Sequence, residues 1–284
     1  MRNFTFKGLF LTAVFALLGC LSIQAADDDL ITKQITIKLD KAGTLPDRIA
    51  SSKKYKITNL KIVGEINGTD WNMIREMAGR NYQESSTEGN LSVLDLSEAK
   101  IVAGGDYYYY DNLFNNKVYT SNDEIGEYAF AYCSGLTSLT LPVGITSIGE
   151  FAFSGCSGLT SLTLPAGITS IGEFAFSYCS GLTSIYVYAE KVPRIGRYAF
   201  EGCASRKCTL YVPKGTYDNY RLSELGYFEN IVEFDATGID KTTTSTDVEE
   251  VSRYSLNGQR LAVPVKGLNI VKYSDGSARK VVVK

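Results

Sequence analysis

Histidine is absent from the 284 residues of this chain. This excludes Ser–His and Cys–His nucleophilic sites and every metal site built on imidazole ligands. The chain also lacks a large excess of either charge, because 29 lysines and arginines stand against 31 aspartates and glutamates, which gives a formal net charge of −2. Without a basic block, the chain does not have the electrostatic footprint of a nucleic-acid-binding protein. Beyond its first residues it also contains no apolar run long enough to span a membrane.

The first 25 residues are typical of a signal peptide. Arg2 and Lys7 supply positive charge, and residues 9–20 form an apolar core of suitable length. Two interpretations of the processing remain open. The residues before Ala26 suit ordinary signal peptidase, whereas the sequence LLGC that ends at Cys20 resembles a lipobox, in which Cys20 would be acylated and membrane-anchored. In both cases we predict an exported protein, either secreted or held at the outer cell surface.

One phrase recurs through the middle of the chain. It begins as IGEYAF, IGEFAF, IGEFAF and IGRYAF at Ile125, Ile148, Ile171 and Ile195, at steps of 23, 23 and 24 residues. A fixed period of this length indicates a solenoid, in which each coil buries its apolar face only against its neighbours.

Each coil has room for one short strand. Residues 138–141 alternate between polar and apolar side chains, which predicts a half-buried strand that Pro142 ends. Residues 150–153 are too few for a stable α-helix, so we predict a 3₁₀-like turn on the opposite wall. Stacked coils would then align one strand each into a parallel sheet.

The repeated motif LxxLxLPxxIxxIGxxAFxxC resembles the leucine-rich repeats of the BspA-like family of bacterial surface proteins. The flanking segments INGTDWNMIREMAG and LYVPKGTYDNYR, the second followed by NIVEF, resemble those of the same family. The resemblance implies a leucine-rich-repeat solenoid of short parallel strands with short helical or 3₁₀ turns. It also implies a non-catalytic adhesin toward host extracellular-matrix proteins, such as fibronectin and fibrinogen, or toward other bacteria.

The predicted solenoid covers residues 26–235. It divides into an N-terminal cap (26–122), regular repeats (123–206) and a C-terminal cap (207–235). Within the caps we predict strands at 34–39, 56–62, 91–96, 208–213 and 230–234, helices at 44–51, 70–78 and 216–225, and a loop that bulges from one coil at 104–122. Thr69 or Asp70 would cap the helix at 70–78.

Residues 236–248 have the composition of a linker, and residues 249–284 are predicted to form a small all-β module. Asn257-Gly258 and Asp275-Gly276 are hairpin-turn signals between alternating strands. The module resembles short C-terminal β-modules of secreted bacterial proteins, some of which act as sorting signals. A role limited to capping or spacing is the alternative.

A binding surface is predicted on the concave wall of the solenoid, where polar strand positions align from coil to coil. One row of this wall is Lys61, Asp95, Thr140, Thr163, Tyr186 and Tyr211, and its neighbour is Asn59, Val93, Ser138, Ser161, Ser184 and Thr209. Tyr186, Tyr188 and Tyr211 would cluster at the C-terminal end and offer large contact area at small entropic cost. The alternative is that these tyrosines merely suit a half-exposed strand.

Tyr107, Tyr108, Tyr109 and Tyr110 form a second candidate contact, a binding loop for a protein or a carbohydrate. In the alternative, two of the four rings pack beneath the loop.

Two further rows follow from the period. Glu127, Glu150, Glu173 and Arg197 recur at one position, which we interpret as a solvated face rather than a Ca²⁺ site. Cys133, Cys156, Cys179 and Cys203 recur at an inward position, as expected for buried thiols, and the spacing of Cys203 and Cys208 leaves a disulfide open.

No set of residues converges on catalysis, so the predicted protein is not an enzyme and uses no metal or cofactor. We expect a secreted or cell-surface binding protein whose partner is a host-matrix or bacterial surface protein. A surface component that captures carbohydrate is one alternative, and a structural spacer or self-associating surface protein is the other. Contact with a membrane is expected only through the lipid anchor at Cys20, and no nucleic-acid partner is expected.

Overall fold

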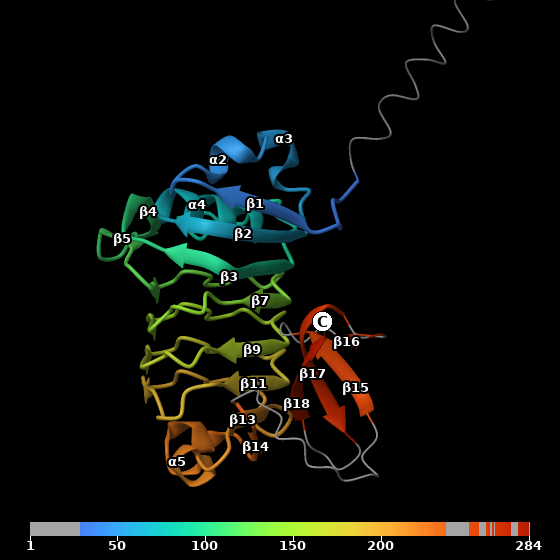
Figure 1. Ribbon diagram of the computed structural model, residues 1–284. Coiled ribbons are helices and arrows are strands. Elements are labelled where there is room, and N and C mark those ends of the chain that lie inside the picture. Colours follow the sequence, from blue (N-terminus) through green and yellow to red (C-terminus); the bar gives the residue numbers. More distant parts are fainter. Residues whose placement is uncertain are drawn as a thin grey trace, which may run out of the picture.

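The computed structural model describes residues 29–236, 250–255, 260–261, 263, 265–273 and 278–283. The predicted signal peptide with Cys20, the two predicted hairpin turns after residue 256, and all but the first residue of the predicted linker lie outside these residues. Figure 1 shows the coils stacked into a solenoid, along which the chain advances from β1 to β14.

One side of the solenoid is an eight-stranded sheet in which every neighbouring pair is parallel. The predicted leucine-rich-repeat fold with its parallel sheet is thereby confirmed. In order, the strands are β1 (Ile35–Leu39), β2 (Asn59–Ile66), β3 (Val93–Ile101), β7 (Ser138–Thr140), β9 (Ser161–Leu164), β11 (Ser184–Val187), β13 (Thr209–Pro213) and β14 (Asn230–Phe234).

A second, narrower parallel sheet runs up another side of the coils. Its strands have two residues each and are β6 (Glu124–Ile125), β8 (Ser147–Ile148), β10 (Ser170–Ile171) and β12 (Arg194–Ile195). These strands contain the isoleucines that begin each repeat, and Ile125, Ile148 and Ile171 are buried. The 23-residue period therefore places two strands in every coil, of which only the longer one was predicted.

The turn after each short strand divides its backbone hydrogen bonds between two partners. In residues 149–156, the amide of Ala152 donates to the carbonyl three residues earlier (3.4 Å), as in a 3₁₀ turn. The amides of Phe151 and Phe153 instead donate to carbonyls of the next coil, at 3.0 and 2.7 Å. A regular 3₁₀ helix cannot form because alternate amides hold the coils together, so the predicted turn is only partly right.

Close approach of the coils explains one glycine of the repeat. A Cβ atom at Gly172 would lie 2.6 Å from the backbone nitrogen of Glu150 in the previous coil, which is well inside a normal contact. At another position of the turn, glycine alternates with tyrosine, because the ring of Tyr132 lies over Gly155 and the ring of Tyr178 over Gly202.

Two aromatic rows run the length of the regular coils. The buried row is Phe130, Phe153, Phe176 and Phe200, with ring centroids 5.0–5.4 Å apart and interplanar angles of 3–14°. The second row is Tyr128, Phe151, Phe174 and Tyr198, nearer the surface and in the left-handed backbone region. Each coil thus buries its rings against the two adjacent coils.

The cysteine row lies in the same core, as predicted. The thiols of Cys156, Cys179 and Cys203 donate to the carbonyls of Phe130, Phe153 and Phe176 at 3.1–3.2 Å. Burial raises the pKa of Cys133 to about 11 and that of Cys203 to about 12. Cys203 and Cys208 are buried free thiols in this structure.

The N-terminal cap closes the stack with three helices, α2 (Leu45–Arg48), α3 (Ser51–Lys54) and α4 (Gly68–Met77). Where a single helix was predicted at 44–51, the structure has the shorter α2, and α3 begins at the last residue of that range. Asn67, rather than Thr69 or Asp70, caps α4, because its side chain accepts a bond from the amide of Thr69 and the Asp70 carboxylate accepts one from the Asn67 amide. Trp71 of α4 extends the phenylalanine row, with its ring centroid 5.3 Å from that of Phe130.

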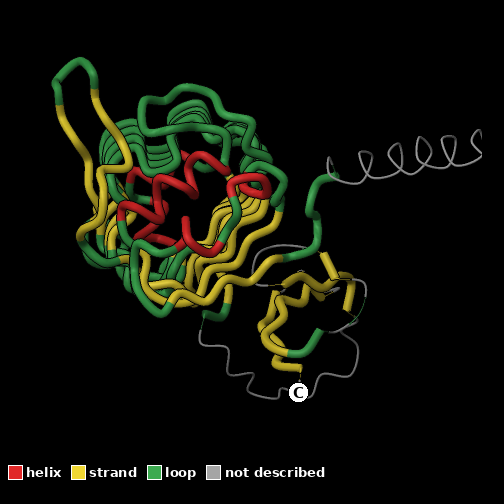
Figure 2. The backbone as a smooth tube through the Cα atoms, turned by 90° about the horizontal axis from the view of Figure 1, so that it is seen from above, coloured by secondary structure: helices red, strands yellow, loops and turns green. Residues whose placement is uncertain are grey.

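The segment predicted as a loop at 104–122 is instead a β-hairpin of β4 (Gly104–Asp111) and β5 (Asn116–Thr120). Figure 2, seen along the stack, shows this hairpin projecting from the side of the solenoid. The helices lie across the end of the solenoid. The turn is built by Asp111, whose carboxylate accepts bonds from the amides of Leu113 and Phe114, and by Asn115 at φ 51°.

The C-terminal cap consists of α5 (Tyr217–Arg221), the 3₁₀ helix η1 (Glu224–Tyr227) and β14. A four-stranded antiparallel sheet then follows in the order β16 (Arg260–Leu261), β15 (Glu250–Ser255), β17 (Gly267–Tyr273) and β18 (Ala278–Val283). We call these strands the C-terminal sheet. Figure 1 places it beside the C-terminal half of the long sheet, and Figure 2 shows it on the outer side of the stacked strands.

Candidate functional site

Two rows of polar side chains line the outward face of the long sheet, at the positions that the repeat period predicts. The strand register joins Lys61 to Asp95, Asp95 to Thr140, and Thr163 to Tyr186 and then Tyr211. We call this the threonine–tyrosine row. Its neighbour, the serine row, joins Asn59, Val93, Ser138, Ser161, Ser184 and Thr209 in the same way.

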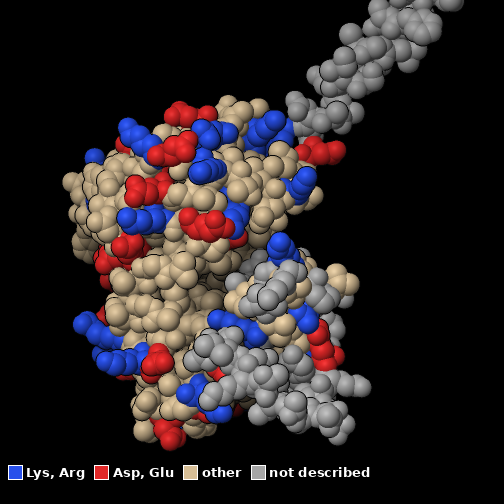
Figure 3. All heavy atoms as spheres, in the orientation of Figure 1, with Lys and Arg blue, Asp and Glu red and all other residues tan. Residues whose placement is uncertain are grey.

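At the N-terminal end of the face, the charges are matched within the protein. The ammonium group of Lys61 lies 3.4 Å from a carboxylate oxygen of Asp95 and 2.6 Å from one of Glu98. The hydrogen bond that Lys61 donates to Glu98 and the charge of Asp95 raise the pKa of Lys61. Figure 3 shows charged side chains gathered over these first coils, while the face in view carries few charged side chains on the middle coils.

At the C-terminal end, the three predicted tyrosines do cluster. The rings of Tyr186 and Tyr211 stack with centroids 4.4 Å apart and planes within 6°, and Tyr188 meets Phe234 edge-on at 5.0 Å. Burial raises the pKa of Tyr188 to about 12 and also raises that of Tyr186. Deprotonation of these phenols is therefore suppressed. In the structure both rings contact Phe234.

The chain's own C-terminal sheet covers this tyrosine cluster. The ammonium group of Lys280 lies 4.0 Å from the ring centroid of Tyr188, and that of Lys272 lies 6.0 Å from the centroid of Tyr211. Both are cation–π distances. Burial lowers the pKa of Lys280. A large partner therefore meets these tyrosines only where the C-terminal sheet leaves them open.

The face of the C-terminal sheet that meets the tyrosines follows from its register. Tyr254 pairs with Ile270, Ile270 with Lys280, and Ser252 with Lys272. Because side chains two apart on a strand share a face, all five lie on one side of the sheet. Sequence reasoning did not identify Tyr254, Lys272 or Lys280, since nothing in an alternating strand says which distant surface its face will meet.

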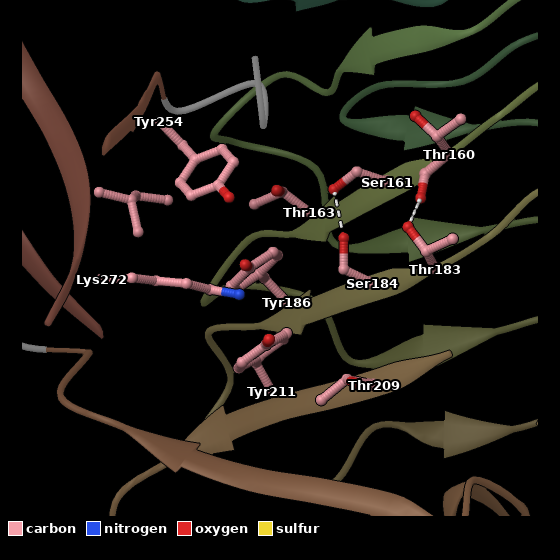
Figure 4. A pocket seen from close by; sticks show the side chains of 11 residues that line it. Thr160, Ser161, Thr163, Thr183, Ser184, Tyr186, Thr209, Tyr211, Tyr254 and Lys272 are labelled. Carbon is pink, nitrogen blue, oxygen red and sulfur yellow. Dashed lines mark hydrogen bonds between the residues drawn. The ribbon is translucent and has the colours of Figure 1, made fainter. Parts of the chain in front are cut away.

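A cavity of about 300 Å³ remains between the two surfaces. From the long sheet it is lined by Thr160, Ser161, Thr163, Thr183, Ser184, Tyr186, Thr209 and Tyr211, and from the C-terminal sheet by Tyr254, Ile270 and Lys272. Figure 4 shows Tyr254 and Lys272 reaching toward the open space in front of Thr163 and Tyr186.

The four consecutive tyrosines of β4 separate into two pairs. Tyr108 and Tyr109 are buried, with 1% and 6% of their surface exposed, so the prediction that they form a binding loop is wrong. The hydroxyl of Tyr108 donates to the Glu127 carbonyl at 2.9 Å, and the ring of Tyr109 stacks on that of Tyr128 at 4.2 Å. Only the half-exposed Tyr107 and Tyr110 remain as candidates for contact.

The row of Glu127, Glu150, Glu173 and Arg197 is exposed. Partial burial, together with the neighbouring charges of Glu127 and Glu173, raises the pKa of Glu150. Within the described residues, no group of three or more aspartate, glutamate or cysteine side chains is arranged to hold a metal ion. Over the same residues, no helix has the length and apolar character needed to cross a membrane.

Residues 103–220 match the family model described as a BspA type leucine rich repeat region, in six copies. A comparison with curated proteins finds no match. Among solved structures, a leucine-rich repeat protein from Bacteroides ovatus ATCC 8483 is 22% identical, with a TM-score of 0.36, over 70% of this chain and 42% of that one. The chain therefore spans less than half the length of that protein. The match over residues 103–220 confirms that this stretch resembles a leucine-rich-repeat region of the BspA type, as predicted.

Proposed function

We propose that this chain is a non-catalytic binding protein, secreted or held at the outer cell surface, that recognises another protein through the outward face of its long sheet. A BspA-type repeat region is a module suited to protein interaction, and the proposed partners are host extracellular-matrix proteins or surface proteins of other bacteria. The observation that carries the proposal is the continuous register of the threonine–tyrosine and serine rows across successive coils. Such a wall suits an extended partner, because one coil after another offers the same pair of positions.

The open part of the face is its N-terminal and middle portion, from β2 to β7, because residues of β9 already line the cavity under the C-terminal sheet. There the small side chains of Ser138 and Thr140 are half exposed and form an even surface. The ion pairs of Lys61 lie at the edge of this surface and contribute selectivity more than affinity, because their charges are already compensated. At the other end, Tyr186, Tyr188 and Tyr211 act mainly in the contact with the C-terminal sheet.

The test compares two arginine substitutions in one coil. Thr140→Arg places a large charged side chain in the middle of the open face, at a strand position where later coils tolerate tyrosine. Val143→Arg is the matched control, since Val143 is 76% exposed in the loop directly after β7 and lies off the face. Binding to immobilised fibronectin, fibrinogen and whole bacterial cells is measured for the chain from Ala26 onward and for both variants.

We expect at least a tenfold loss of affinity for the recognised protein in Thr140→Arg and none in Val143→Arg, with unchanged melting temperatures. Equal loss in both variants would mean that the face is not the contact. Absence of binding to every protein and cell tested would overturn the adhesin proposal and favour a structural spacer.

A further inference from the structure

The cavity between the long sheet and the C-terminal sheet arises from a step in side-chain size. Along the threonine–tyrosine row, Thr140 and Thr163 are short, whereas Tyr186 and Tyr211 are long. Tyr211 covers one face of the Tyr186 ring, and Thr163 is the strand partner on the other side. Because threonine cannot fill the space that another tyrosine would occupy, that second face of Tyr186 looks into the cavity.

The walls of the cavity are rich in hydroxyl groups. Six serines and threonines line it together with the phenols of Tyr186, Tyr211 and Tyr254. Ser184 donates to the Ser161 oxygen at 3.0 Å, which leaves the Ser161 hydroxyl proton available, and no protein partner holds the Thr163 hydroxyl among the described residues. Hydroxyls both donate and accept, so they match a ligand whose own polar groups are hydroxyls.

One positive charge faces this space. The ammonium group of Lys272 lies 5.8 Å from the ring centroid of Tyr254 and 6.0 Å from that of Tyr211, so it stands between the two surfaces. No carboxylate within the described residues comes within 4.0 Å of it. Residues 250–284 carry seven lysines and arginines against two carboxylates, so the surrounding field favours an anion.

We propose that this cavity binds an acidic saccharide, namely a sugar ring that carries a carboxylate group. The apolar face of the ring lies on the free face of Tyr186, its hydroxyls bond to Ser161 and Thr163, and its anionic group pairs with Lys272. A volume of about 300 Å³ is at the lower end for ligand pockets and suits one sugar unit rather than a folded peptide.

This site is separate from the protein-binding face proposed above, because it lies under the C-terminal sheet and not on the open coils. Neither proposal depends on the other. Loss of saccharide binding would leave the Thr140→Arg result unaffected, and the reverse also holds.

The experiment titrates the chain from Ala26 onward with glucuronic acid, N-acetylneuraminic acid, glucose and inorganic sulfate, using isothermal calorimetry and ligand-detected NMR. Lys272→Gln removes the charge, and Lys266→Gln is the matched control, because Lys266 is an exposed lysine just before β17 that does not line the cavity. Thr163→Tyr fills the cavity with the residue that the next two coils carry at the same position, so it blocks the site without loss of the fold.

We expect a sugar acid to bind at least tenfold more tightly than glucose, with at least a tenfold loss in Lys272→Gln, complete loss in Thr163→Tyr, and no change in Lys266→Gln. Equal binding of glucose would show that the charge plays no part and would overturn the proposal. Sulfate binding as tightly as a sugar acid would identify an adventitious ion only. Unchanged affinity in Thr163→Tyr, or no binding of either sugar acid, would overturn it as well.

Discussion

The phenylalanine row makes a quantitative prediction for one side chain, Phe153. Its ring is fully buried and lies between two parallel rings, those of Phe130 at 5.4 Å and Phe176 at 5.0 Å. Truncation of a buried phenylalanine to alanine costs about 3–5 kcal/mol, and each aromatic pair adds about 0.5–1.5 kcal/mol beyond area burial. With two pairs lost at once, we expect Phe153→Ala to lower the free energy of unfolding by about 4–8 kcal/mol.

The assay is urea denaturation followed by far-UV circular dichroism, with the midpoint and the slope both compared with those of the unchanged chain. Tyr178→Ala is the control, since that ring is 61% exposed and lies in the next coil, and we expect a loss below about 1 kcal/mol. A double-mutant cycle between Phe153 and Phe176 should give a coupling of about 1 kcal/mol. A loss below about 2 kcal/mol for Phe153→Ala, or a coupling near zero, would refute the claim that ring stacking joins the coils.

Three further predictions follow from groups described above. Glu150→Gln should raise stability at pH 7 by at most about 0.5 kcal/mol, because burial and like charges raise the carboxyl pKa but solvent screens this exposed group. The gain should vanish as the pH falls through that raised pKa, where the native glutamate is protonated and uncharged; a gain that persists at low pH would contradict this cause. The five thiols from Cys133 to Cys208 should resist iodoacetamide at pH 8 until urea unfolds the chain, since burial raises their pKa, and mass spectrometry would detect any early adduct. Tyr188→Ala should speed amide exchange in β17 and β18 about fivefold while β9 is unchanged, because it removes the ring beneath Lys280; equal rates would show that this contact does not hold the C-terminal sheet.

The repeats could be predicted from the sequence because their apolar positions recur at a fixed step and each coil contacts only its neighbours. Ile125, Phe153 and Cys156 are buried in the structure, as their periodicity predicts. The two-residue strands β6, β8, β10 and β12 escaped prediction because two residues are too few to show alternation. Their hydrogen bonds exist only between coils.

The hairpin β4–β5 was missed for a different reason. Four consecutive tyrosines show no alternation of polar and apolar residues, and in the structure the adjacent Tyr108 and Tyr109 are both buried where the strand pairing is irregular. The signals for the turn were present in Asp111 and Asn115, which favour tight local bonding and the left-handed region.

The candidate site could be predicted only in part. The register placed Tyr186 next to Tyr211, but no pattern in the chain could tell that Lys272 and Lys280 would cover them. That contact joins two units far apart in sequence, and the alternation of β17 would look the same against any partner.

The near-identity of the central coils has a consequence for how such a chain can change its length. Phe153 and Phe176 each contact one phenylalanine in the coil before and one in the coil after, so recombination that adds or deletes one 23-residue unit would create no foreign junction. The C-terminal sheet follows β14 in the chain and would move with the last coils, and it would always conceal the same tyrosines. Gene-level expansion would therefore lengthen only the uncovered portion of the wall, and copy number alone could adjust the reach of the protein.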